Sequence, residues 1–146
     1  GAKYINVYVT FYGWADNDPP GKAIAYPRTR YPEALHSEAS GTGTYDDPLT
    51  FASDPNEWPV GTLLYVPYIK KYVVMEDWCS VCVGDWQNHQ KHHIDIWMDS
   101  DESFREELLE CENHWTRRRT KVEIDPPAGR EVSTTPLFNQ QSGKCL

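Results

Sequence analysis

Short apolar runs separated by turn residues occupy most of the chain, and several of them alternate apolar with polar side chains. The clearest example is residues 92–99, HHIDIWMD. Within it, three apolar residues alternate with an imidazole, a carboxylate and an indole: Ile94, Ile96 and Met98 with His93, Asp95 and Trp97. A period of two is typical of a β-strand with one buried face. The pattern therefore predicts that the imidazole, the carboxylate and the indole share one face of a strand.

The same patterning predicts an all-β chain with long loops. A polar loop rich in Pro, Gly, Asp and Ser fills residues 13–44, and residues 49–53 fit either a short strand or a turn. The expected strands span residues 4–12, 49–53, 63–66, 72–76, 94–98 and 120–124. Strands this short are most stable when the sheet closes, because a closed barrel has no free edges. We therefore expect a six-stranded β-barrel.

One short helix is expected, at residues 103–112 (SFREELLECE). Ser103 is a suitable N-cap, and Glu106 completes a capping box. The apolar residues of this segment fall on one helical face: Phe104, Leu108 and Cys111. With 146 residues and no internal repeat or linker, the chain fits a single domain, residues 1–146. Its C-terminal tail is expected to be irregular and pinned by a disulfide of Cys145.

The four cysteines are Cys79, Cys82, Cys111 and Cys145. An even number in a small chain rich in Pro and Trp favours two disulfides in a secreted, extracellular protein, with three possible connectivities. The stretch Cys79-Ser-Val-Cys82 also fits half of a zinc site or a redox pair. A four-cysteine zinc site usually needs a second close pair, which Cys111 and Cys145 do not form. A redox pair is expected at the start of a helix in a βαβ unit, and the pattern predicts no helix there.

The charge balance limits the classes of partner. Acidic residues outnumber basic ones by 22 to 14, and a net charge of −8 argues against non-specific nucleic-acid binding. No stretch approaches the roughly 20 apolar residues of a membrane span. Tyr and Trp are abundant, at nine and six residues, which suits a surface that stacks on sugar rings. We expect a monomer that binds neither nucleic acid nor membrane.

Three stretches in order resemble the double-psi β-barrel proteins, which include expansins, family 45 endoglucanases, lytic transglycosylases and RlpA-like domains. Residues 10–13 read TFYG, where expansins carry a TWYG-like stretch on the first strand. Residues 59–66 (PVGTLLYV) lead into 73–77 (VVMED), a segment typical of this barrel, and residues 93–95 read HID in place of HFD. The resemblance runs from about Val7 to Trp97. It implies a double-psi β-barrel and action on a polysaccharide.

The resemblance also implies catalytic roles. Asp95 matches the aspartate that acts as general acid in the hydrolytic relatives, and Asp77 matches a second carboxylate of the lytic transglycosylases. Cleavage of a glycosidic bond needs an acid that protonates the leaving oxygen. The endoglucanases place a base aspartate directly after the first strand, where this chain has Gly13-Trp14. Asp16 and Asp18 follow in the loop at positions that the sequence does not constrain.

Asp46 is the other candidate for a second catalytic carboxylate. It lies in GTGTYDDP, residues 41–48, where two glycines allow close approach to a ligand, although an Asx turn explains it as well. The expected sugar-binding residues are Thr10, Tyr12, Trp14, Tyr45, His93 and Trp97. His89 is within reach of His93, but the adjacent His92 faces the other side of the strand. We therefore expect no metal and no cofactor.

Three functions fit these residues. The first is a secreted enzyme of muramidase or lytic-transglycosylase type that cleaves β-1,4 bonds, with peptidoglycan favoured over cellulose or chitin. The second is a non-catalytic, expansin-like protein that binds or loosens walls, because the endoglucanase base is missing. The third is a small secreted inhibitor or effector with a protein-binding surface. The single-acid arrangement suits muramyl cleavage and is the reason for favouring peptidoglycan. Among the three functions we favour the enzyme.

Overall fold

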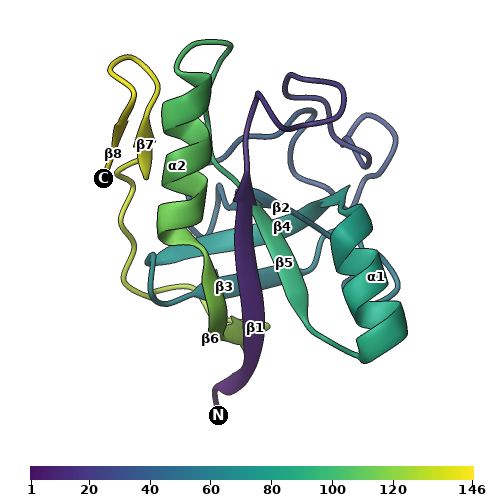
Figure 1. The fold of residues 1–146 in the computed structure, drawn as a ribbon. Coiled ribbons are helices and arrows are strands. Elements are labelled where there is room, and N and C mark those ends of the chain that lie inside the picture. The colour runs from purple at the N-terminus through teal and green to yellow at the C-terminus, as the bar shows by residue number, and fades with distance from the viewer.

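Six strands close into a barrel in the computed structural model, which describes residues 1–146 (Figure 1). The strands are β1 (Lys3–Tyr12), β2 (Leu49–Ser53), β3 (Leu63–Val66), β4 (Lys71–Trp78), β5 (His93–Trp97) and β6 (Arg117–Ile124). Around the barrel they follow the order β1-β5-β2-β4-β3-β6. β1 runs parallel to β5 and β2 parallel to β4, whereas the other neighbours are antiparallel. The prediction of a closed six-stranded β-barrel is confirmed, and residues 49–53 are a strand.

The alternation along β1 and β5 divides their side chains between the barrel core and an outer face. Apolar residues of both strands lie in one cluster of 19 buried residues, among them Val7, Val9, Phe11, Ile94 and Ile96. The intervening residues stand opposite each other because the strands are in parallel register: Tyr8 with His93, Thr10 with Asp95, and Tyr12 with Trp97. The predicted strand at residues 94–98 is therefore confirmed as β5, displaced by one residue at each end, and polar groups of β1 and β5 meet on the outer face of the barrel.

Helix α2 (Arg105–Trp115) confirms the one expected helix but begins and ends two to three residues later than predicted. Leu108 and Cys111 are buried on its inner face. The predicted Ser103 cap is wrong, since the N-cap is Phe104, which has φ of 55° and makes no side-chain cap bond. The Ser103 amide instead donates to Asp101 in a turn, and the Phe104 ring lies against Gly143.

A second helix, α1 (Ser80–His89), corrects the expectation of a single helix. Its sequence, SVCVGDWQNH, buries only Cys82 and includes a glycine and two valines, which lower helix propensity. The ends stabilise it instead. Cys79 is the N-cap, and Gln90 adopts a left-handed conformation in which its amide donates to the carbonyls of Asp85 and Trp86.

The long loop between β1 and β2 is fixed to β4 by two consecutive carboxylates. Glu76 is fully buried and accepts hydrogen bonds from the backbone amides of Leu35 and His36 at 2.7 Å each. Its other oxygen meets the His36 ring at 2.7 Å and the Thr50 hydroxyl at 2.8 Å. This contact raises the pKa of His36. The next residue, Asp77, accepts from the amide of Ala25 in the same loop. A polar loop is thereby held over one end of the barrel (Figure 1).

The C-terminal tail packs beside α2 and ends in a small hairpin of β7 (Phe138–Asn139) and β8 (Lys144–Cys145) (Figure 1). Cys145 is joined to Cys111 of α2, and Cys79 is joined to Cys82. The prediction of two disulfides is confirmed, and their connectivity is now defined. Neither helix combines the length and apolarity required to cross a lipid bilayer.

Candidate active site

A cleft of about 630 Å³ opens on the outer face of β1 and β5. Its walls come from six parts of the chain, namely β1, β2, β5, the end of β4, the start of α1 and the loop residues 16–25. The polar side chains that line it include Thr10, Asp16, Asp77, His93 and Asp95. The cleft therefore brings together both carboxylates that the resemblance singled out, with Thr10, Tyr12 and His93 of the expected sugar-binding residues.

Strand pairing explains why Asp77 and Asp95 meet in one cleft. Ala52 of β2 is the register partner of Asp77 on β4 and also of Asp95 on β5. Since neighbouring strands lie roughly 4.8 Å apart, the two aspartate backbones are separated by about 10 Å. Ala52 itself lines the cleft and is buried in a small cluster with Tyr12 and Trp97.

The Asp95 carboxyl group has a pKa close to neutral pH. Burial of this carboxyl group, together with the charges of Asp16 and Asp77, raises the pKa to about 7 against the opposing effect of a hydrogen bond from Thr10. Thr10 Oγ1 lies 2.9 Å from Asp95 Oδ1, and no protein group bonds Oδ2. A carboxylic acid with its pKa near 7 and a free oxygen in a cleft is suited to proton transfer.

Asp95 is the end of a hydrogen-bonded chain of four side chains. Thr10 Oγ1 lies 2.8 Å from His93 Nε2, and His93 Nδ1 lies 2.8 Å from Asp85 Oδ2 on α1. Burial lowers the pKa of His93, although Asp85 opposes this, so the neutral ring is favoured. The Thr10 hydroxyl has one proton and therefore donates either to Asp95 or to His93. When Asp95 is protonated, its carboxyl group donates a hydrogen bond to the Thr10 hydroxyl. The Thr10 hydroxyl then donates its own proton to the neutral His93 ring.

Asp77 is arranged differently, because the protein bonds both of its carboxylate oxygens. It accepts hydrogen bonds from the Tyr12 hydroxyl at 2.7 Å and from the amides of Ala25 and Trp78 at 2.8 and 2.9 Å. Burial raises the pKa of Asp77, and these three donors lower it. Desolvation and the Asp77 charge hold the pKa of Tyr12 well above its usual value, so Tyr12 remains a donor. Asp77 therefore fixes the cleft wall and the long loop.

Asp16 enters the cleft from the loop, where the sequence left its position open. Its Oδ1 accepts from the Gly13 amide at 2.7 Å, which forms a turn directly after β1. Glu112 at the end of α2 packs against it, and burial together with the Asp16 carboxylate raises the pKa of Glu112 to about 10. Glu112 is consequently neutral at pH 7.

The structure places the predicted aromatic residues unequally. Trp97 is fully buried, and its ring packs edge-on against Tyr12 at a centroid distance of 5.3 Å, so it supports the wall from inside. Trp14 packs partly buried on the same small cluster and does not line the cleft. Tyr8 does line it and stacks on His93 at 4.3 Å. The aromatic ring most accessible to a sugar is Trp78, which is 51% exposed.

Tyr45 and Asp46 lie away from the cleft. Their loop is bonded to the start of β4, where the Tyr72 amide donates to the Gly43 carbonyl at 2.7 Å. Tyr45 packs edge-on against Tyr72, and Asp46 is exposed. Asp77 stands five residues further along β4, which corresponds to roughly 17 Å of extended strand. The structure therefore does not bring Asp46 together with Asp95.

Sequence reasoning missed Asp85 and Trp78 as parts of the site. Asp85 could not be recognised because α1 was not predicted. Without that helix, its separation of eight residues from His93 does not indicate a contact between the two side chains. Trp78 directly follows Asp77. A predicted strand that ended two residues later would have placed Trp78 next to that aspartate. His92 turns to the opposite side of the strand and bonds Glu57, and no group of three or more His, Cys, Asp or Glu side chains is arranged to hold a metal ion.

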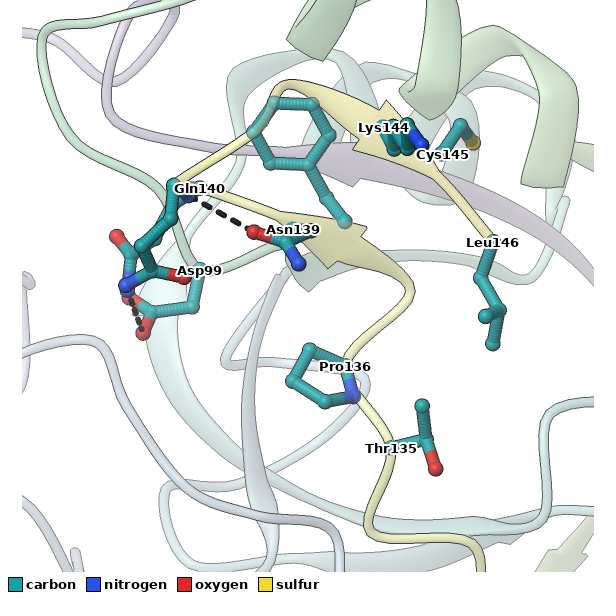
Figure 2. Close-up of a pocket in the computed structure, with 10 residues that line it drawn as sticks. Asp99, Thr135, Pro136, Asn139, Gln140, Lys144, Cys145 and Leu146 are labelled. Carbon is teal, nitrogen blue, oxygen red and sulfur yellow. Dashed lines mark hydrogen bonds between the residues drawn. The ribbon is translucent and has the colours of Figure 1, made fainter.

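A second cavity, of about 350 Å³, lies at the C-terminal hairpin (Figure 2). Asp99, Asn139 and Gln140 line it together with Lys144 and the chain end. In Figure 2 the Gln140 side chain points toward Asp99, and these groups are 3.5 Å apart. It contains no residue that the sequence predicted as catalytic or sugar-binding. The cleft on β1 and β5 is therefore the candidate active site.

Comparison with known proteins matches residues 4–146 to the family model described as the DDB_G0273701 N-terminal domain. The chain belongs to this family. It is 38% identical over 144 residues to a Dictyostelium discoideum protein described as "Uncharacterized protein DDB_G0273701/DDB_G0273221". The alignment covers 99% of this chain and 61% of that protein, so the chain spans about three fifths of the length of its curated relative. No solved structure matches the chain.

The DDB_G0273701 N-terminal domain family model covers every residue that lines the cleft. Within this family domain, the site offers one carboxylic acid with a raised pKa, a hydroxyl and an imidazole hydrogen-bonded in series with it, and one exposed indole in the same cleft. Such a set can donate a proton to a bound ligand and take it back. The chemistry within reach is general acid–base catalysis by a single carboxyl group.

Proposed function

We propose that this domain is a secreted enzyme that cleaves β-1,4 glycosidic bonds of a cell-wall polysaccharide, with Asp95 as the general acid. The observation that carries the proposal is the Asp95 carboxyl group, whose pKa is raised to about 7 at the base of an open cleft. An acid that protonates a leaving sugar oxygen must hold its proton near the working pH. The exposed Trp78 ring supplies an apolar surface for a sugar ring.

The two carboxylates whose charges act on Asp95 are both engaged by the protein, which favours a mechanism with one acid. Asp16 is held by the Gly13 amide and by the protonated Glu112. Asp77 is committed to three donors and is therefore proposed as a positioning residue. A hydrolase needs a second carboxylate as base or nucleophile. A lytic transglycosylase needs only one, because the 6-hydroxyl of the sugar attacks. For this reason we propose peptidoglycan ahead of cellulose or chitin, with cleavage of the muramidase or lytic-transglycosylase type.

The finer fold assignment belongs to the same proposal. A closed six-stranded barrel with two parallel pairings, β1 with β5 and β2 with β4, is compatible with the double-psi topology. The TFYG and HID stretches lie side by side in it, since Thr10 and Asp95 are register partners. Two disulfides in a small domain are typical of oxidising compartments and support secretion.

A non-catalytic wall binder of expansin type is the second candidate. The observation that favours it is the same engagement of Asp77, which leaves no free carboxylate of the β4 strand to act as a base. A binder would retain the cleft and the Trp78 surface and release no product. Product formation therefore separates the two candidates.

The test is mass spectrometry of soluble products after incubation with purified peptidoglycan, cellulose and chitin. We expect muropeptides with a 1,6-anhydro end from the wild type, and a loss of at least about 10²-fold in Asp95→Asn. Asp125→Asn is the matched control, because Asp125 is exposed, lies outside the cleft and has a φ of 48° that asparagine tolerates. No product from any polymer, with retained binding to insoluble wall, would overturn catalysis in favour of the binder.

A further inference from the structure

The Cys79–Cys82 disulfide stands in the wall of the cleft, at the start of α1. The sequence pattern predicted no helix at this Cys-x-x-Cys stretch, and a redox pair is expected at the start of a helix. The structure supplies the helix: ten residues long, beginning directly after Cys79, with no acidic residue in its first turn. We propose that Cys79 and Cys82 form a redox-active pair that exchanges disulfides with thiol substrates entering the cleft.

The two sulfur atoms differ in access. Cys79 is half-buried and lines the cleft, whereas Cys82 is fully buried and packs toward the Ala52 carbonyl. An incoming thiolate therefore reaches only Cys79. Exposed apolar side chains flank it on both sides, Trp78 at 51% and Val81 at 63% exposure, and they give a thiol-bearing peptide a surface to bind.

The position of Cys79 favours its thiolate. Cys79 Sγ accepts the Cys82 amide at 3.1 Å, and as the N-cap it lies at the positive end of the helix dipole. Helix N-termini stabilise a cysteine thiolate, which makes the sulfur a better leaving group and a competent nucleophile. Cys79 and Cys82 are three residues apart, whereas Cys111 and Cys145 are 34 residues apart. The first disulfide therefore closes a much shorter loop and restrains the unfolded chain less than the second does. Reduction of the first disulfide is thus compatible with a folded domain.

The proposed reaction exchanges the Cys79–Cys82 disulfide with one substrate dithiol or with two substrate monothiols. A substrate thiolate attacks Cys79 Sγ, the bond to Cys82 breaks, and Cys82 leaves as a thiolate that takes up a proton. A second substrate thiolate then attacks the substrate sulfur of the mixed disulfide and releases the Cys79 thiolate. Two electrons pass from the substrate, which becomes a disulfide, to the protein, which becomes a dithiol. This step uses neither Asp95 nor a polysaccharide.

The first test is a redox titration of the folded wild type in glutathione buffers, with acid quenching, alkylation and peptide mass spectrometry. We expect Cys79 and Cys82 to become alkylated while Cys111 and Cys145 remain joined and tryptophan fluorescence stays native. Asp95→Asn should give the same titration, which separates this pair from the polysaccharide proposal. Reduction of Cys79–Cys82 only under conditions that also unfold the domain would overturn the proposal.

The second test identifies the attacked sulfur and the source of the thiol. Cys82→Ser should trap one glutathione on Cys79 when treated with glutathione disulfide, at least about tenfold faster than Cys79→Ser traps one on Cys82. Reduced, unfolded ribonuclease added to the wild type should gain disulfides faster than free glutathione does if the substrate is a protein thiol. The reverse order assigns a small thiol, and equal trapping of both variants would contradict the proposed asymmetry.

Discussion

The end of β4 and the middle of β5 each place one aspartate beside Ala52, and the two are held in opposite ways. Asp77 accepts three hydrogen bonds from the protein and connects two strands to the long loop. Asp95 meets only the Thr10 hydroxyl, and its pKa is raised to about 7. The two carboxylates therefore differ in role although they line the same cleft. The one with satisfied bonds stabilises the fold, and the one left poorly satisfied is available for chemistry.

The largest expected effect separates the two aspartates by stability. Asp77→Ala leaves the Tyr12 hydroxyl and two backbone amides without their acceptor, so we expect it to lower the free energy of unfolding by about 3–4 kcal/mol. Asp95→Ala removes one hydrogen bond and one poorly solvated carboxyl group, so we expect a change below about 1 kcal/mol. Urea denaturation at pH 7, followed by tryptophan fluorescence, measures both. Equal costs for the two variants would remove the distinction.

The sequence carried this distinction only in part. The period of two around Asp95 and the resemblance of TFYG and HID located Thr10, Asp95 and, through VVMED, Asp77 in one cleft. Strand alternation is a local property, and it survives folding because one face of each strand must be buried. The hydrogen bonds of Asp77 were not readable, since Ala25 reaches it from a loop more than 50 residues away in sequence.

Two other elements show where local patterns fail. The α1 segment has no apolar periodicity, because it is held by its cap, its disulfide and the bond between Asp85 and His93. The loop of Asp46 looked suited to a ligand by its glycines. Gly43 instead lets the backbone approach Lys71, whose side chain is within 3 Å of the space that a Cβ would fill. Glycine there serves packing between segments, which a single sequence does not reveal.

The next largest effect is the contribution of Asp95 to the pH dependence of the free energy of unfolding. The pKa of Asp95 is about 7 in the folded protein and near 3.8 when unfolded, so the folded state binds the extra proton between these values. Stability therefore falls as the pH rises from about 4 to about 7. We expect the Asp95 share to be on the order of 1–3 kcal/mol, allowing for solvent in the cleft.

The difference between wild type and Asp95→Asn isolates this share. Burial raises the pKa of Asp77 and Glu112 as well, so both proteins keep a slope of the same sign from those groups. Urea denaturation at half-unit steps from pH 4 to pH 8 should show the wild-type advantage over Asp95→Asn decreasing up to about pH 7 and then levelling. Parallel profiles would mean that Asp95 ionises in the folded protein as it does in the unfolded chain.

The smallest expected effect concerns the one hydrogen bond that Asp95 does receive. Thr10→Val keeps the shape of the side chain and removes the hydroxyl, which stabilises the ionised carboxylate more than the acid because charge-assisted bonds are stronger. The pKa of Asp95 should therefore rise by roughly half a unit to one unit. Carboxyl carbon-13 NMR of Asp95 reads this pKa directly, and the alkaline limit of product release should move with it. Thr29→Val, an exposed threonine outside the cleft, should leave the pKa unchanged. A lower pKa in Thr10→Val would show that the hydroxyl serves mainly the protonated acid, as an acceptor linked to His93.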